Sequence, residues 1–132
     1  MTAPREPRWL TLEEVLVAHE RQLRRFGGPE GVRDAGALDS ALARPRNSFA
    51  YGETNLARLA AGYAFGIARN HPFVDGDKRA SFLALMMFLR LNGVAFAPAQ
   101  APAAAIILAL AAGDVNEDGL TRWIADNWPA TP

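Results

Sequence analysis

Apolar residues recur at intervals of three and four along most of this chain, the spacing that places them on one face of an α-helix. The pattern predicts about six helices. Their expected ranges are 12–26, 34–43, 56–70, 78–92, 102–112 and 117–128. Thr11 and Glu14 form a capping box before the first helix, and Asn55, Asp77 and Asn116 are expected to cap later ones.

Glycine and proline mark where these helices are expected to end. Gly27, which is followed by a second glycine and a proline, can take the left-handed conformation that closes the first helix. The second helix is expected to stop near Arg44, because Pro45 disfavours a helical conformation in the residue before it. Strand-like alternation is confined to two or three residues around 94–96.

For two of the predicted helices, the sequence also indicates which side chains are buried. The first should bury one stripe of side chains. That stripe consists of Leu12, Val15, Leu16, His19 or Leu23, and Phe26. The helix over 78–92 is apolar on nearly all sides, which is typical of a helix at the centre of a bundle. We therefore expect an all-α fold, a compact bundle formed as a single domain by residues 1–132, with 1–8 as a flexible N-terminus.

The composition narrows the functional classes. The 132 residues include 14 basic and 14 acidic side chains, so the chain lacks the excess positive charge of a general nucleic-acid or anionic-membrane binder. There is no cysteine, which excludes disulfides and thiolate chemistry. The longest apolar run, 101–112, is too short to cross a bilayer. We expect a cytoplasmic protein that contacts neither a membrane nor nucleic acid directly.

One segment combines several side chains that suit phosphate and metal chemistry. It reads His-Pro-Phe-Val-Asp-Gly-Asp-Lys-Arg over 71–79, and its Lys78 is the only lysine in the chain. A loop at the amino end of a helix presents free backbone N–H groups and the positive end of the helix dipole to a phosphate. Gly76 has no Cβ to block such an approach, while Lys78 and Arg79 add two cations.

The same segment holds a candidate base and a candidate metal ligand. His71 is the candidate general base, because an imidazole exchanges protons near neutral pH. Asp75 supplies the hard oxygen that Mg²⁺ prefers, with nucleotide phosphates and water completing the coordination. Phe73 is expected to anchor the loop in the core. His19 has no reactive neighbours in the sequence, so we interpret it as a structural residue.

In this order the nine residues resemble the signature of the Fic/Doc family, HPFx[DE]GN[GK]R, and they are most similar to its Doc (death-on-curing) subfamily of toxins. Segments 25–28, 31–34 and 88–94 also resemble that subfamily. The resemblance covers nearly the whole chain. It implies the helical Fic/Doc fold, in which the motif loop precedes a central helix.

The resemblance implies an activity as well. Most Fic proteins transfer a nucleoside monophosphate to a protein hydroxyl and have glycine where this chain has Lys78. Doc toxins have lysine there and transfer the γ-phosphate of ATP to a threonine of elongation factor Tu, which halts translation. By position His71 matches the catalytic base, Asp75 the metal ligand, and Lys78 and Arg79 the phosphate clamps, while Arg69 matches an arginine that the subfamily uses near the site.

Asp77 departs from the family pattern, which has asparagine at this position. The two residues are nearly equivalent as helix caps, but an ionised aspartate cannot donate a hydrogen bond as asparagine can. A carboxylate ~4 Å from a phosphate oxygen costs up to about 4 kcal/mol at an effective dielectric of 20. Several consequences are open. Asp77 either serves as a second metal ligand, weakens the binding of ATP, or changes the phosphoryl donor or acceptor. It could also be a substitution that inactivates the protein.

Three functions follow from these observations. The first is a Doc-like protein kinase that uses ATP and Mg²⁺. The second is a Fic-type nucleotidyl (AMP) transferase, against which Lys78 argues. The third is a catalytically impaired module that mainly binds an antitoxin, because Asp77 replaces the family asparagine.

The resemblance also implies a protein partner. Doc toxins are neutralised by a small, Phd-like antitoxin whose C-terminal segment folds into a groove beside the active site. The chain contains no Ser/Thr-x-x-x-Glu-Gly/Asn segment of the kind with which some Fic proteins inhibit themselves, which fits inhibition in trans. We expect a groove between the first helix and the motif helix that accepts an amphipathic helix. Arg21, Arg24 and Arg25 either pair with acidic residues of that helix or form a solvated face.

Overall fold

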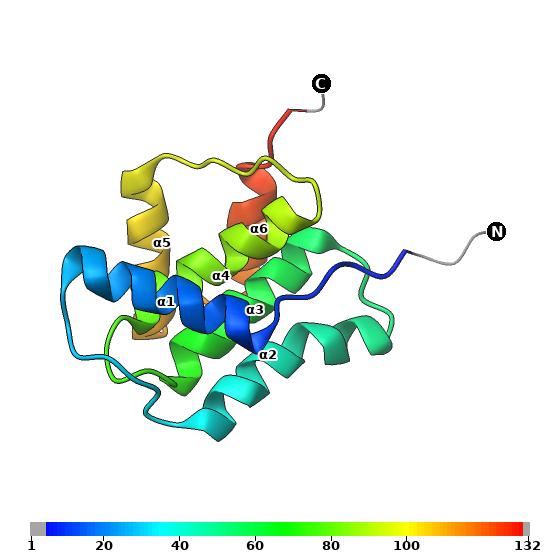
Figure 1. Ribbon diagram of the computed structural model, residues 1–132. Helices are drawn as coiled ribbons and strands as arrows, with labels where there is room; N and C mark the ends of the chain where they lie inside the picture. Colours follow the sequence, from blue (N-terminus) through cyan, green and yellow to red (C-terminus); the bar gives the residue numbers. More distant parts are fainter. Residues whose placement is uncertain (1–4, 131–132) are drawn as a thin grey trace.

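The computed structural model describes residues 5–130, which form six helices joined by short irregular connections (Figure 1). The helices are α1 (Leu12–Phe26), α2 (Ala35–Ala50), α3 (Leu56–Asn70), α4 (Asp77–Leu91), α5 (Gln100–Ala112) and α6 (Glu117–Asp126). The described residues contain one isolated β-bridge, between Val32 and Phe73. The predicted all-α fold is confirmed. No helix within 5–130 has both the length and the hydrophobicity of a membrane span.

Side-chain caps determine where several helices begin. The Thr11 hydroxyl accepts the N–H of Glu14 at 3.1 Å, and the Glu14 carboxylate accepts the N–H of Thr11 at 2.9 Å, which completes the predicted capping box. Asn55 and Asn116 cap α3 and α6 as predicted. Asp34 is the cap of α2 instead of its first residue.

Helix α2 continues past the proline that was expected to end it. It runs to Ala50, and Pro45 lies buried in its interior, so the predicted end at Ala43 is wrong. A proline inside a helix loses one backbone hydrogen bond. Pro45 nevertheless packs on α3, where a Cβ added to Gly62 would lie 3.4 Å from its Cγ. The packing of α2 on α3 therefore outweighs the local preference of the sequence.

Helices α3 and α4 share the centre of the bundle (Figure 1). Most residues of α3 are buried, and alanine and glycine predominate among them, which allows neighbouring helices to approach closely. In α4 the buried residues are Ala80, Ser81, Ala84, Leu85, Phe88 and Leu89. Leu83 and Met87 are half-buried, so α4 is less completely enclosed than its apolar sequence suggests.

Helix α1 buries a narrower stripe than the sequence predicts. Val15, His19 and Leu23 are buried, whereas Leu12 and Phe26 are 43% and 53% exposed. The three buried residues follow one another at intervals of four and form a single line that faces the core. Leu12 and Phe26 lie in the terminal turns outside that line, and the expectation that both are buried is wrong.

The segment after α4 forms no strand. Residues 94–99 are irregular, so the strand-like alternation at 94–96 corresponds to no strand. Phe96 is buried there, with its ring 5.9 Å from that of Trp123 and edge to face with it. The alternation in the sequence reflects the burial of this one aromatic side chain. Helix α5 begins two residues earlier than predicted, at Gln100, and α6 ends two residues earlier than predicted, at Asp126.

The segment before α1 is joined to the bundle by polar contacts. The backbone of Arg8 donates to Oδ1 of Asn92 at 2.9 Å and accepts from its Nδ2 at 3.0 Å. The N–H of Leu10 donates to the hydroxyl of Tyr63 at 3.0 Å, and burial raises the pKa of that hydroxyl. Of the stretch 1–8 that was expected to be flexible, residues 1–4 lie outside the described residues.

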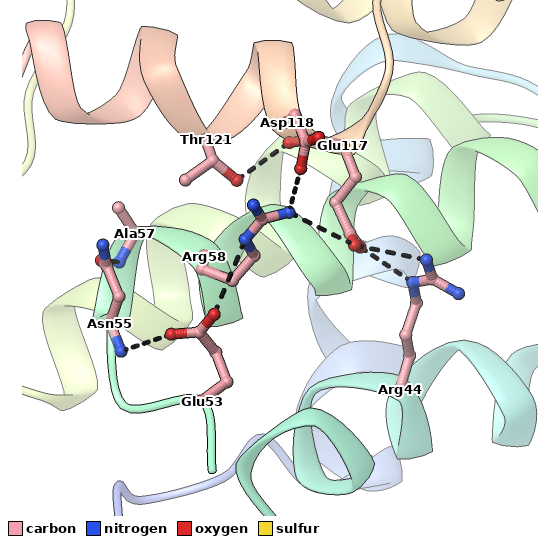
Figure 2. A network of polar contacts seen from close by, with 8 residues as sticks. All are labelled: Arg44, Glu53, Asn55, Ala57, Arg58, Glu117, Asp118 and Thr121. Carbon is pink, nitrogen blue, oxygen red and sulfur yellow. Dashed lines mark hydrogen bonds and ion pairs between the residues drawn. The ribbon is translucent and has the colours of Figure 1, made fainter. Parts of the chain in front are cut away.

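A cluster of ion pairs joins α2, α3 and α6 on the surface (Figure 2). Nε of Arg44 donates to Glu117 at 2.9 Å, and Arg58 lies within 4.0 Å of the same carboxylate. Glu53 and Asp118 also pair with Arg58. Partly exposed pairs contribute little singly, but this network links three helices around one carboxylate.

We predict that Gly66→Ala destabilises the fold, although alanine is the better helix former by about 1 kcal/mol. A Cβ at Gly66 would lie 3.0 Å from both Cα and Cβ of Ala41 in α2, so the two helices must separate. Overpacking of this kind costs about 1–3 kcal/mol in the free energy of unfolding. Urea denaturation followed by circular dichroism measures the loss.

Gly62→Ala is the matched control in the same helix. Its added Cβ would meet Cγ of Pro45 at 3.4 Å, an ordinary contact, so we expect unchanged or increased stability. Equal effects of the two substitutions would contradict the close approach of α2 to α3 at Gly66.

Candidate functional site

The motif loop, residues 71–76, joins the carboxyl end of α3 to the amino end of α4. His71 closes α3 in the left-handed conformation, with φ 49° and ψ 55°, and is the one non-glycine residue within 5–130 with a positive φ. Such a conformation costs about 1–3 kcal/mol and persists where surrounding contacts enforce it. Here Arg33 supplies them, because it donates through Nε to the carbonyl of His71 at 2.8 Å and through Nη2 to that of Asn70 at 3.2 Å.

The segment between α1 and α2 holds the backbone of the motif loop. The N–H of Val74 donates to the carbonyl of Gly31 at 3.0 Å, and the N–H of Arg33 donates to the carbonyl of Pro72 at 2.7 Å. Phe73, between them, is 1% exposed and lies in the core. The loop is therefore fixed by main-chain contacts that leave its polar side chains available.

Asp77 does not cap α4, contrary to the prediction. Gly76 occupies the cap position without a side-chain hydrogen bond, and Asp77 is the first residue of the helix. The left-handed conformation of Gly76 turns the chain so sharply that the Asp77 carboxylate folds back towards the loop. Its Oδ1 accepts the N–H of Phe73 at 3.0 Å, and its Oδ2 lies 3.5 Å from Nδ1 of His71.

A pocket of about 430 Å³ opens at the amino end of α4. Its walls are formed by Ala68, His71, Val74, Asp75, Gly76, Asp77, Lys78, Arg79 and Ala111. The structure thus brings together His71, Asp75, Asp77, Lys78 and Arg79, five of the polar residues that the sequence singled out. The first turn of α4 adds backbone N–H groups that have no intrahelical partner.

The loop itself contributes fewer N–H groups to this pocket than expected. Those of Phe73, Val74 and Gly76 already donate to Asp77, to the carbonyl of Gly31 and to Asp75, respectively. An anion in the pocket would therefore meet the N–H groups of the first turn of α4 and not a nest formed by the loop.

Gly76 makes a contact different from the one expected. Its φ of 82° favours glycine, and a Cβ there would lie 3.3 Å from Nε2 of His19. The absence of a side chain thus accommodates the sharp turn and the close approach of α1. Gly76 also lines the pocket, so proximity to a phosphate remains a prediction.

The predicted phosphate-binding cations are brought together only in part. Lys78 and Arg79 both line the pocket. The guanidinium of Arg79 lies over the ring of Phe26, 4.3 Å from its centroid, a cation–π contact that restricts its orientation. Arg69 does not line this pocket, and its guanidinium lies 5.7 Å from the ring of Phe65 on α3.

The carboxylates suit a metal ion that arrives with a nucleotide. Within residues 5–130 no group of three or more His, Cys, Asp or Glu side chains converges on a metal position. Mg²⁺ in nucleotide sites usually takes one or two carboxylates, with phosphates and water supplying its other ligands. Asp75 and Asp77 both line the pocket, which fits such an ion.

Two residues that support the site were not predicted from the sequence to do so. His19 is 5% exposed, and its Nε2 lies 2.7 Å from the carbonyl oxygen of Asp75. The place of His19 on the buried stripe of α1 indicated its burial but not its partner. Arg33, which binds the end of α3, carried no signal beyond its membership of the family-like segment 31–34.

A groove of about 580 Å³ lies between α1 and α4, the two helices between which a groove was predicted. It is lined by Glu13, Glu14, Val17, Ala18, Arg21, Gln22, Leu83 and Met87. Of the three arginines expected beside it, Arg21 is among these residues. Arg24 pairs with Glu20, and Arg25 lies over the ring of Phe26.

A larger hollow, of about 780 Å³, lies between α2 and α3 and reaches Glu117. Its guanidinium groups are those of Arg44 and Arg58, which already pair with carboxylates (Figure 2). It contains neither His71 nor the first turn of α4. This hollow therefore contains none of the predicted catalytic, metal-binding or phosphate-binding residues.

Comparison with known proteins identifies the family. Residues 9–89, more than half of the chain, match the model of the Fic/DOC family. The chain belongs to the Fic/DOC family. It is 35% identical over 88 residues to protein kinase doc of Escherichia phage P1, covering 66% of this chain and 70% of that protein. It is 44% identical over 92 residues to toxin Doc of Mycolicibacterium smegmatis, covering 67% and 68%. The resemblance seen in the motif is confirmed.

We predict that Arg33→Ala loosens the backbone around His71. Hydrogen bonds from a charged donor contribute about 1.5–3 kcal/mol, and the exposure of Arg33 reduces this to roughly 1 kcal/mol. The amide hydrogen of Val74 donates to Gly31, which lies in the same segment as Arg33, so it should exchange faster with solvent in this variant. Hydrogen exchange followed by NMR measures the change.

Arg24→Ala serves as the control for Arg33→Ala. Arg24 is also exposed, and its partner is Glu20 on the surface of α1. We expect no change at Val74 in this variant. Identical exchange rates in the two variants would show that Arg33 does not hold the loop.

Proposed function

We propose that this chain is the toxin of a toxin–antitoxin pair and acts as a protein kinase that transfers the γ-phosphate of ATP to a protein hydroxyl. One observation carries the proposal: His71, Asp75, Lys78 and Arg79 line a single pocket at the amino end of α4. The names of two relatives, protein kinase doc and toxin Doc, support the same reaction and role.

His71 is the general base of the proposed reaction. Its side chain is 59% exposed, so the hydroxyl of a large protein substrate can reach it. The Asp77 carboxylate, 3.5 Å from Nδ1, favours the ring proton on that nitrogen and leaves the Nε2 lone pair free. Nε2 takes the hydroxyl proton, the hydroxyl oxygen bonds to the γ-phosphorus, and the bond from that phosphorus to the bridging oxygen breaks, releasing ADP.

The remaining residues of the pocket stabilise negative charge. Lys78 provides a compact ammonium group, and Arg79 provides a planar guanidinium held over Phe26. Asp75 holds Mg²⁺ together with the phosphates of the nucleotide, and this ion supplies further neutralising charge when bound. The N–H groups of the first turn of α4 also stabilise the negative charge of the phosphates.

The acceptor that the family resemblance implies is a threonine of elongation factor Tu. Phosphorylation of that factor would block translation and account for toxicity. A pocket open to solvent at His71 is compatible with an acceptor presented by a folded protein.

The proposed antitoxin site is the groove between α1 and α4. Val17, Leu83 and Met87 supply apolar surface there, and Glu13 and Arg21 supply charges. An amphipathic helix, such as the C-terminal segment of a Phd-like antitoxin, places an apolar face against such a surface. The groove shares α4 with the motif loop, so an occupant would lie close to the pocket.

We predict that the wild-type protein transfers label from γ-labelled ATP, but not from α-labelled ATP, to a protein of a bacterial lysate. His71→Ala should reduce the transfer by about 10²- to 10⁴-fold, because the general base is lost. Autoradiography of the separated proteins measures it. Arg122→Ala, an exposed residue of α6, is the control and should retain activity. Label from the α position would indicate a nucleotidyl transferase instead.

We predict that Asp77→Asn strengthens the binding of Mg·ATP by roughly tenfold, or about 1.4 kcal/mol, because it removes a negative charge from the pocket wall. Oδ1 of asparagine can still accept the N–H of Phe73, so the stability of the fold should change little. Isothermal titration calorimetry measures the affinity. Weaker binding would identify Asp77 as a metal ligand. Binding detectable only in the variant would favour the impaired, antitoxin-binding module.

A further inference from the structure

His19 holds the motif loop from inside the core. It lies on the inner face of α1, and its Nε2 is 2.7 Å from the carbonyl oxygen of Asp75. Its ring stacks on that of Phe73, with the centroids 3.7 Å apart and the planes at 15°. Within residues 5–130, His19 and Ser81 are both buried, and the side chain of each contacts a backbone carbonyl oxygen. The partner of Ser81 lies within α3, whereas the partner of His19 lines the pocket.

The contact with His19 acts on one peptide unit. The carbonyl of Asp75 and the N–H of Gly76 belong to the same planar group, so they rotate together. The carbonyl faces His19, and the N–H donates to Oδ1 of Asp75 at 2.8 Å. A rotation of this peptide would therefore break both hydrogen bonds and release the carboxylate from its N–H partner.

Gly76 makes such a rotation easy unless another contact opposes it. Its φ is 82° and its ψ 20°, and glycine reaches other conformations at little cost. The carboxylate of Asp75 also lies close to the backbone of Gly28, where an added Cβ would be 2.4 Å from its Oδ2. The direction of the carboxylate thus follows the orientation of the peptide that His19 contacts.

We propose that His19 is a positioning residue for the magnesium site. Its Nε2–H donates to the carbonyl of Asp75 and fixes the peptide between Asp75 and Gly76. In this orientation Asp75, the proposed ligand of Mg²⁺, lines the pocket. The inference rests on the proposed function and adds to it a residue of α1 that touches neither nucleotide nor acceptor. Loss of a hydrogen bond behind a metal ligand typically lowers metal affinity by about 10- to 100-fold.

The test compares His19→Phe with His19→Gln. Phenylalanine can still stack on Phe73 but has no donor for the carbonyl of Asp75, whereas the glutamine amide can donate. Calorimetric titration with ATP is carried out with and without Mg²⁺, and circular dichroism confirms the fold of each variant. We expect His19→Phe to weaken the binding of Mg·ATP by about 10- to 100-fold and to leave the weaker binding of metal-free ATP unchanged. His19→Gln should recover most of the affinity.

Ser81→Ala is the matched control, because it removes a buried hydrogen bond of 2.9 Å from a side chain to a backbone carbonyl, and Ser81 does not line the pocket. We expect its affinity for Mg·ATP to equal that of the wild type. Equal affinities in the wild type and His19→Phe would overturn the role of His19 and leave the kinase proposal standing. A wild-type protein that binds no Mg·ATP would overturn both.

A measurement on the wild type covers the case in which His19→Phe fails to fold. Donation to Asp75 requires the proton of the neutral ring to lie on Nε2. Nitrogen NMR of the imidazole should show that tautomer, with a protected Nε2–H. A ring that carries its proton on Nδ1 alone would overturn the proposal.

Discussion

The orientation of the motif loop between α3 and α4 is maintained by hydrogen bonds to its main chain from residues elsewhere in the fold. Arg33 and Gly31 hold its first half, and His19 contacts the carbonyl of Asp75 in its second half. Because these contacts engage the backbone, the side chains of His71, Lys78 and Arg79 remain free to line the pocket. A left-handed histidine and a left-handed glycine within six residues would not hold a single conformation without such support.

The same arrangement explains why α3 is rich in small side chains. Helix α3 packs against both α2 and α4, and the motif loop joins α3 to α4. Gly66 lets α2 approach to the point where a single added Cβ would touch the backbone of Ala41. The close approach of α2 to α3 thus depends on a residue of the helix that leads into the motif loop.

Much of this could be predicted from the sequence, because it depends on neighbours in the chain. Periodicity indicated all six helices, and the capping residues Thr11, Asn55 and Asn116 indicated three of their beginnings. The order of residues 71–79 indicated the family. Where prediction failed, a tertiary contact outweighed a local preference. Helix α2 continues through Pro45, which packs on Gly62. Asp77 does not cap α4, because its carboxylate contacts the N–H of Phe73 and the ring of His71.

The sequence by itself determined the class of fold, the place of the reactive loop and the residue types within it, since each of these is encoded in a short stretch of chain. Only the tertiary structure decided which of those residues share a pocket. It excluded Arg69 from the pocket lining, directed Asp77 towards His71, and gave His19 a partner 56 residues away. Such contacts depend on how helices pack against one another, and the linear order of residues does not reveal that.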